Sequence, residues 1–233
     1  MNEHYYQGNK LPHWHPSGAT FFITARLFGS IPKPVIEQLK AEYQLALYEI
    51  QREKIEPENA EKLLPAELTE AIERIRRKKA YDAGKRYFSS FDQFLDSNLN
   101  EPYWLASPEI ARLNAENLHF YAEKYFDLWA FTIMSNHFHM LLTIRNGMSA
   151  LWKVLQDLKK YSGRQSNRIL GREGTFWEEE SYDHWLRPGE FDRIVAYILN
   201  NPVKAKVVKD WRDHPWTYCH PSLQDVPPNP SSV

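Results

Sequence analysis

The chain of 233 residues has one cysteine, Cys219. A single cysteine cannot form an intramolecular disulfide, and it excludes a cysteine-rich zinc site. No apolar run approaches the roughly 20 residues that a membrane-spanning helix needs. Residues 1–10 lack a basic region followed by an apolar run, so we expect no secretory signal and a cytoplasmic, nucleoid-associated protein without a membrane partner.

The chain also lacks an excess of charge of either sign, since its formal net charge is −1. A near-neutral chain is unlike a protein that coats nucleic acid without specificity, although a local basic face remains open. The charges are in fact uneven. Residues 71–86 hold seven basic residues against two acidic ones, and residues 153–172 hold six against one. Acidic residues gather instead at 54–70 and 178–180.

What is present is enough for a packed core: 42% of the residues are hydrophobic and 14% are aromatic. This composition excludes global disorder. The length fits one large domain or a small domain with an insertion. The Pro/Ser-rich end, residues 221–233, is expected to be a flexible tail.

The order of the expected elements indicates an α+β fold. β-branched and aromatic residues predict strands at 18–28, 126–134 and 137–144, the last two joined by a hairpin turn. Helical periodicity predicts helices at 33–54, 107–125, 149–170 and 189–201, and a second helical pattern over 55–86 that is broken at Pro57 and Pro65. The helix at 189–201 should end before Pro202, because the residue before a proline disfavours the helical region.

Strand, helix, hairpin and helix together fit a ferredoxin-like antiparallel sheet with helices on one face. The extra helices form a helical insertion at about 33–120. We therefore expect a single domain over residues 1–220.

Two histidines share one face of the strand at 137–144. Side chains alternate along a strand, so His137 and His139 point the same way and Phe138 points to the other side. Two such imidazoles can hold one divalent ion, or they can be two hydrogen-bonded core residues. A divalent ion usually needs at least a third protein ligand, so the pair alone leaves both readings open.

The helix at 189–201 offers that third ligand. Tyr197 and Asn201 are four residues apart and lie on one helical face. The Asn201 amide oxygen could bind the ion while the Tyr197 phenol lies beside it as a nucleophile. Tyr197 also has a structural reading, as a core aromatic between Ile194 and Ile198.

Four separated motifs resemble a known family. They are "LPHWHPSGATFFITARLFGSIP" (11–32), "MSNHFHMLL" (134–142), "FWEEESYDHWLR" (176–187) and "YILNNPVKAKVV" (197–208). Together and in this order they are similar to the Y1 tyrosine transposases of the HUH endonuclease superfamily, and most of all to the REP-associated tyrosine transposases. The resemblance extends over about residues 11–219. It implies a ferredoxin-like sheet with the histidine pair on a central strand.

The resemblance also implies roles for particular residues. His137, His139 and Asn201 match the metal ligands of the family, and Tyr197 matches its nucleophile. The residue before the Asn-His step is often proline in the family, whereas here it is Ser135. This departure affects the turn and not the ligands, so we expect activity to survive it.

The chemistry implied is metal-dependent cleavage and rejoining of single-stranded, hairpin-forming DNA, such as REP-like DNA, through a 5′-phosphotyrosine intermediate. The cofactor would be Mg²⁺ or Mn²⁺, and mixed His/Asn ligands keep Mn²⁺ open. The REP-associated branch implies a monomer rather than a dimer.

Tyr161 is the rival nucleophile, since it lies on the basic helix at 149–170. Its neighbour four residues on, Gln165, is a possible ligand, so spacing alone does not dismiss it. The alignment through the Asn201-Pro202 step favours Tyr197.

Several basic residues are candidates for contacting DNA. On the helix at 149–170 the basic residues could meet phosphates or form an ordinary solvated face. Residues 13–15 could likewise contact a folded hairpin. His184 and Arg187 lie in a family motif and could shape the site, touch DNA or be structural. The candidate set is Arg26, Lys159, Lys160, Arg164, Arg168, His184 and Arg187.

Two other functions stay open at this point. One is a catalytically silent, hairpin-DNA-binding regulator of the same fold, against which the complete set of catalytic residues argues. The other is an unrelated metal hydrolase with a His-x-His pair. Such an enzyme would need an acidic cluster, and no well-spaced set of Asp and Glu residues accompanies the strand.

Overall fold

The computed structural model describes residues 3–7, 12–16, 18–58, 60–97, 101–147 and 150–223. The chain divides into two compact units. Residues 1–30 and 101–233 form one unit, and residues 31–100 form the other. Among the helices described in these ranges, none is long and apolar enough to cross a membrane.

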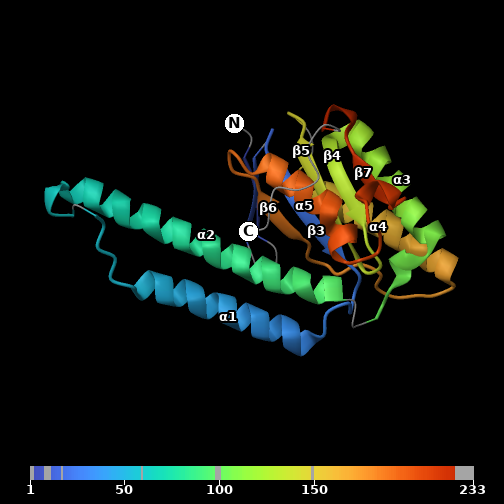
Figure 1. Ribbon diagram of the computed structural model, residues 1–233, viewed down its shortest axis with the longest axis horizontal. Helices are drawn as coiled ribbons and strands as arrows, with labels where there is room; N and C mark the ends of the chain where they lie inside the picture. Colours follow the sequence, from blue (N-terminus) through green and yellow to red (C-terminus); the bar gives the residue numbers. More distant parts are fainter. Residues whose placement is uncertain are drawn as a thin grey trace. The chain divides into compact units, whose positions relative to one another are not determined.

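The first unit is built on a five-stranded antiparallel sheet with the strand order β6-β3-β5-β4-β7 (Figure 1). A separate pair of strands, β1 (Glu3–Gln7) and β2 (Pro12–Pro16), forms a small antiparallel ribbon. The five strands of the sheet are β3 (Thr20–Arg26), β4 (Phe126–Ile133), β5 (His137–Ile144), β6 (Tyr182–Trp185) and β7 (Thr217–Cys219).

Among its described residues this unit has three α-helices: α3 (Pro108–Tyr125), α4 (Leu151–Leu170) and α5 (Phe191–Lys204). Taken along the chain, β3, α3, β4, β5, α4 and β6 follow the split βαβ order of a ferredoxin-like fold. The expected α+β class and the ferredoxin-like antiparallel sheet are therefore confirmed. β5 lies in the middle of the sheet, between β3 and β4.

Helices cover both faces of the sheet, whereas the sequence predicted one face. α3 and α4 pack on the face formed by the apolar side chains of the strands, with Phe138, Met140 and Leu142 of β5 in their shared core. α5 packs against β4 and β5 from the opposite side (Figure 1). The expected arrangement holds for α3 and α4, and α5 is the exception, because its apolar side covers part of the second face.

Contacts at α4 hold the helices together over the apolar face of the sheet. Asn117 on α3 donates its side-chain N–H to the Leu158 carbonyl at 3.1 Å, which ties α3 to α4. α4 ends at Gly171, whose left-handed φ of 61° suits glycine and lets its N–H and that of Arg172 reach the last carbonyls. Gly163 faces Phe176 and Trp177, and a Cβ there would stand 3.2 Å from Phe176 Cβ.

α5 continues through Pro202 to Lys204, so the prediction that the helix ends before the proline is wrong. The position of the proline explains the difference. Proline removes one backbone donor and disturbs the turn before it, and only two residues of the helix follow Pro202, so little of α5 depends on the lost hydrogen bond. The last turn is closed instead by Ala205 N–H on the Asn201 carbonyl at 2.9 Å and by Val207 N–H on the Pro202 carbonyl at 2.9 Å.

The second unit is a pair of helices, α1 (Lys33–Arg52) and α2 (Pro65–Ser97), packed along one another. The rings of Tyr43 and Tyr87 stack between them with centroids 5.1 Å apart. Lys79 of α2 forms an ion pair with Glu53, just after α1.

The insertion was expected at about 33–120, but α3 lies outside this helix pair and packs with α4 and β4. The organisation of residues 1–220 as one domain stays a prediction. Of the expected tail, residues 221–223 form a single 3-10 turn. Residues 224–233 lie outside the described residues.

Candidate active site

The two histidines of β5 converge on one point. His137 and His139 are 1% and 0% exposed, and their Nε2 atoms lie 3.1 Å apart. Their ring centroids are 4.6 Å apart. Alternation along the strand places both rings on the face that α5 covers, while Phe138 enters the core with α3 and α4.

The outer nitrogen of each ring already has a partner. His137 Nδ1 lies 2.6 Å from Asn136 Oδ1, and because an amide oxygen only accepts, Nδ1 donates its hydrogen. His139 Nδ1 lies 2.8 Å from Thr24 Oγ1 on the neighbouring strand. The pairing register places Thr24 directly opposite His139. These partners fix both rings with Nε2 directed at a shared position.

This arrangement fits a divalent cation. When both Nδ1 atoms carry the hydrogen, the two Nε2 lone pairs face each other and need a proton or a cation between them. Two ligands at right angles around an ion, with bonds of about 2.1 Å, stand about 3.0 Å apart. The observed separation of 3.1 Å matches that spacing. His137 and His139 could therefore hold a metal as neighbouring ligands.

Tyr197 lies beside this pair. It sits on α5, and its ring centroid is 5.5 Å from that of His139. Phe22 of β3 completes a small aromatic group, with its ring 5.4 Å from His139 and 5.7 Å from Tyr197. The Lys204 ammonium group lies 5.8 Å from the centre of the Tyr197 ring. A phenol, two imidazoles and a cationic side chain thus gather on one face of the sheet.

Asn201 follows Tyr197 by one turn of α5 and is 1% exposed. Residues four apart lie on the same helical face, so Asn201 belongs to the side of α5 that also carries Tyr197. Its role as the third ligand stays a prediction.

Arg26 lies next to the histidine pair in the sheet, because it is the register partner of His137. Its guanidinium forms an ion pair with Glu178 at 3.1 Å and donates to Ser30 Oγ at 3.5 Å. The side chain is 9% exposed. Arg26 is therefore a buried, paired cation at the edge of the site rather than a solvated one.

A cluster around Glu190 fixes the start of α5. Glu190 is 9% exposed, and its carboxylate accepts a hydrogen bond from the Arg187 backbone N–H at 2.9 Å. The same oxygen lies 2.9 Å from His184 Nε2, and the other oxygen pairs with Arg193 at 2.8 Å. The side chain of Arg187 is exposed. His184 thus connects β6 to the helix that carries Tyr197.

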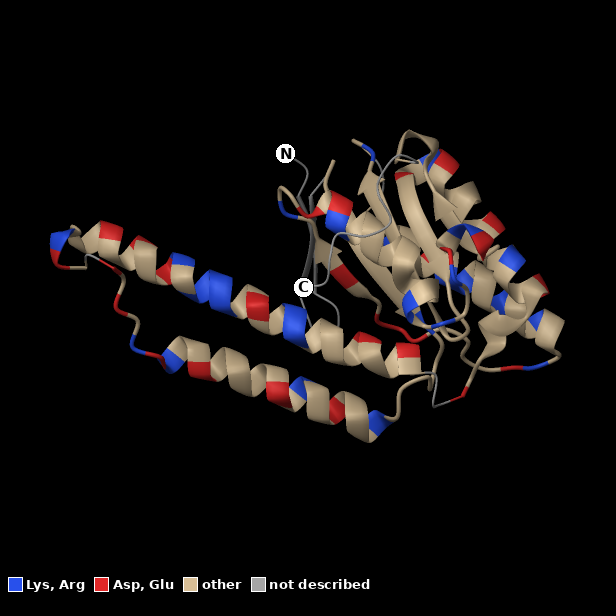
Figure 2. Ribbon diagram, in the orientation of Figure 1, with Lys and Arg blue, Asp and Glu red and all other residues tan. Residues whose placement is uncertain are grey.

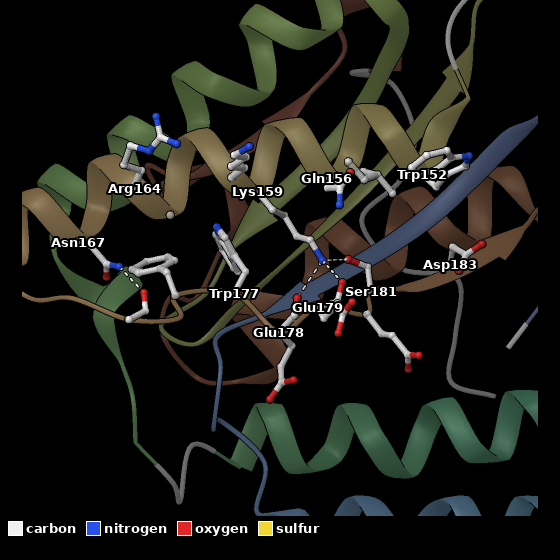
Figure 3. A pocket seen from close by; sticks show the side chains of 16 residues that line it. Trp152, Gln156, Lys159, Arg164, Asn167, Trp177, Glu178, Glu179, Ser181 and Asp183 are labelled. Carbon is white, nitrogen blue, oxygen red and sulfur yellow. Dashed lines mark hydrogen bonds between the residues drawn. The ribbon is translucent and has the colours of Figure 1, made fainter. Parts of the chain in front are cut away.

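The basic residues of α4 that are candidates for contacting DNA lie in different environments. Lys159 crosses to the segment at 178–181 and donates from Nζ to the Glu178 and Glu179 carbonyls, at 2.9 and 2.6 Å, and to Ser181 Oγ at 3.1 Å (Figure 3). Burial lowers the pKa of Lys159 to about 8, although the nearby carboxylates of Glu178 and Glu179 oppose that shift.

A pocket of about 490 Å³ opens between α4 and residues 174–183 (Figure 3). Trp152, Trp177 and Phe176 supply aromatic surface, and Lys160 and Arg164 line it as exposed cations. Arg168 is also exposed and donates to Gln165 Oε1 at 3.1 Å. α4 and residues 174–183 line this pocket, and His137 and His139 are not among its lining residues.

Tyr161 lies on α4 as well, and its side chain is 50% exposed. It is therefore on the opposite side of the sheet from the two imidazoles. Gln165, the ligand suggested for it, has its side-chain oxygen hydrogen-bonded to Arg168.

Among the residues of this site that were not singled out from the sequence are Thr24, Asn136 and Glu190. Asn136 stands directly before His137, and that adjacency is a signal that could have been used. Thr24 becomes visible only through the register of β3 on β5. Glu190 gathers partners from β6, the following turn and α5, and no local pattern indicates this.

No family model and no curated protein matches the chain. Among solved structures, the chain is similar to a REP-associated tyrosine transposase bound to a REP hairpin. The two are 15% identical with a TM-score of 0.44, and the alignment covers 90% of this chain and 82% of the other.

Proposed function

We propose that the protein is a metal-dependent, single-stranded DNA endonuclease and transposase that cleaves and rejoins hairpin-forming DNA. One observation carries the proposal: two imidazoles with convergent Nε2 atoms lie next to the ring of Tyr197. The four sequence motifs supply the substrate class, because they resemble those of the REP-associated tyrosine transposases. We propose that the protein acts as a monomer, as this branch implies.

The reaction assigned to Tyr197 is a transesterification. Its phenolic oxygen attacks the scissile phosphorus, the bond from phosphorus to the 3′ oxygen breaks, and the phenolic proton ends on that oxygen. A 5′-phosphotyrosine link and a free 3′-OH result. Because one ester replaces another, a 3′-OH can reverse the step and join strands without an external energy source.

His137 and His139 would hold Mg²⁺ or Mn²⁺, with Asn201 proposed as the third ligand. The bound ion would supply positive charge that polarises the scissile phosphate. Asn136 accepts from His137 Nδ1 and so would hold that imidazole in the required tautomer, and the Thr24 hydroxyl would fix the orientation of the His139 ring. Glu190 and His184 would fix the start of the helix that carries Tyr197.

We propose two roles for the basic residues of the first unit: direct contact with DNA phosphates, and support of the surface on which the DNA lies. Lys160, Arg164 and Arg168 are exposed and can meet phosphates directly. Arg26, His184 and Lys159 are engaged within the fold, so we propose that they shape the surface on which the DNA lies. Arg187 is exposed at the turn before α5 and is proposed to contact the strand there.

The test is cleavage of a labelled hairpin oligonucleotide with Mn²⁺, followed by a denaturing gel. A labelled band at the mass of protein plus DNA is expected with metal and not with a chelator. Cleavage without an adduct would identify a hydrolase instead. Binding without cleavage on every hairpin tried would identify a silent regulator.

A further inference from the structure

The helix α2 carries more cations than its packing uses. Figure 2 shows Lys and Arg concentrated along the middle of α2. This is the basic stretch at 71–86 of the sequence, and the proposed reaction makes no use of it.

Part of this charge has a structural purpose. The Arg76 guanidinium donates to Glu73 at 3.0 Å and to the Gln51 carbonyl at 3.3 Å, and Lys79 pairs with Glu53. Both cations therefore fasten α2 to the end of α1. They mark the side of α2 that packs in the helix pair.

The opposite side of α2 holds a second set, which we call the basic stripe: Arg74, Arg77, Lys78 and Lys85. At 100° per residue these four fall within an arc of about 100°, and they span about 16 Å along the axis. Between residues 74 and 85 the other member of that arc is Tyr81, whose ring the Lys85 ammonium approaches to 5.7 Å. Glu70 precedes the stripe and Asp82 lies outside the arc.

The four stripe side chains are exposed. Within the part of the chain that the structure describes, none of the four forms an ion pair or hydrogen bond. Arg74 and Lys78 are four residues apart, and like charges at this spacing destabilise a helix. The stripe thus costs the isolated fold some stability, which a polyanionic partner would offset.

The shape and chemistry of the stripe favour duplex nucleic acid. A duplex carries one negative charge per about 1.7 Å of its axis on a stiff rod, so a straight row of cations meets many phosphates at once. A single strand is usually bound in a groove with several stacking aromatic side chains, and the stripe has one tyrosine.

A membrane surface fits the stripe less well. Helices that lie on membranes place large apolar side chains beside their cations. Between residues 74 and 86, no large hydrophobic side chain of α2 is exposed. Between residues 73 and 85 the positions beside the arc are Glu73, Asp82 and Gly84, which are small or acidic.

We propose that the basic stripe of α2 binds the phosphate backbone of duplex nucleic acid, independently of base sequence. The stripe is a second nucleic-acid surface, beyond the strand-cleaving site of the first unit. The inference rests on the proposed function only for the choice of a hairpin stem as the natural duplex. It does not require the Tyr197 chemistry.

The experiment measures binding of the full chain to a fluorescent blunt duplex of about 20 base pairs, by anisotropy at several salt concentrations. The test variant is R74Q/R77Q/K78Q/K85Q, since glutamine keeps helix propensity. We expect binding at least tenfold weaker at low salt. The slope of log affinity against log salt should become shallower by about 0.9 for each phosphate that the variant no longer neutralises.

The matched control is K62Q/R86Q/R112Q/K209Q, which removes the same charge from exposed residues outside the stripe. Its binding should stay within about twofold of the parent if location rather than net charge decides. A further variant, R74K/R77K, keeps the charge and should keep the binding. Circular dichroism and urea unfolding verify that all variants fold.

Three results would overturn the inference. They are equal binding by the stripe variant and the control, loss of binding in R74K/R77K, or displacement of the duplex by polyglutamate as readily as by unlabelled duplex. The proposed function is judged separately, by the adduct on single-stranded DNA. A chain that forms no adduct but binds duplex through the stripe would refute the first proposal and leave this one intact.

Discussion

The two faces of β5 have different roles, although their side chains alternate along the same eight residues. On one face Phe138, Met140 and Leu142 join α3 and α4 in a continuous apolar core. On the other, His137 and His139 meet Thr24, Phe22 and Tyr197.

The comparison shows how a buried strand can carry polar chemistry. The apolar face supplies the stability, because burial of large side chains is the dominant favourable contribution to folding. The histidine face can therefore hold groups that are costly to bury, provided that each finds a hydrogen-bond partner. Asn136 and Thr24 are these partners for the two Nδ1 atoms.

The largest expected effect comes from substitution of Tyr197, and Tyr161 on the other side of the sheet supplies the control. Tyr197→Phe should abolish the covalent protein–DNA adduct while DNA binding is retained, because the ring stays and the nucleophilic oxygen is removed. Tyr161→Phe, on α4, should form the adduct at the parent level. A denaturing gel and an anisotropy titration measure both. An adduct that persists in Tyr197→Phe would place the nucleophile elsewhere.

The apolar face is tested by Phe138→Ala. Phe138 is 1% exposed and packs edge-on against Trp177 at 5.3 Å, so the substitution leaves a cavity. The free energy of unfolding should fall by about 3–5 kcal/mol, measured by urea denaturation. The folded fraction should still form the adduct with Tyr197. Loss of the adduct at unchanged stability would contradict the separation of the two faces.

A smaller effect is expected from Thr24→Val, which keeps the shape of the strand but leaves His139 Nδ1 without its hydroxyl partner. Removing such a partner behind a metal-binding histidine typically weakens the metal about 10- to 100-fold. Calorimetric titration with Mn²⁺ measures the affinity. Thr20→Val, at the far end of β3, is the control, and an equal loss there would rule out an effect specific to His139.

The smallest effect concerns Lys159, whose ammonium group is enclosed by residues 178–181. Burial lowers the pKa of Lys159 to about 8 in the folded protein, below its value in the unfolded chain. The unfolded state therefore binds more protons between about pH 8 and 10, and stability contributed at this residue rises with pH across that window. Urea unfolding measures the free energy of unfolding of the parent and of Lys159→Met at several pH values. From about pH 8 to 10 the free energy of unfolding of the parent should rise relative to that of the variant. A constant difference would contradict the shifted pKa.

The strands and helices with a regular apolar period could be predicted well from the sequence. The expected strand at 137–144 and the helix at 107–125 agree closely with β5 and α3. Both have regular apolar periods, and Pro108 sets the start of the helix. The turn at Ser135 and Asn136 is also found, closed by Met134 N–H on the His137 carbonyl at 2.8 Å.

The short edge strands were missed for a physical reason. β6 has four residues and β7 has three, too few for a period of two to stand out. They form because β3 and β4 offer open edges, which is a tertiary cause.

The candidate site was predictable in its main residues but not in its support. His137, His139 and Tyr197 were found from spacing and motif. Thr24 needed the strand register, and the enclosure of Lys159 by three oxygen acceptors needed the path of residues 178–181. Backbone carbonyls leave no mark in a sequence, so a lysine expected at the surface turned out to be held inside.

The hydrogen bond between Thr24 and His139 joins residues 115 positions apart, and Tyr197 arrives later still in the chain. Contacts this distant form only after slow, long-range strand pairing. During synthesis β3 is therefore complete long before its imidazole partner exists, and the nucleophile follows last. Under the proposed function, a nascent or truncated chain cannot cut DNA, because cutting requires the whole sheet to have closed.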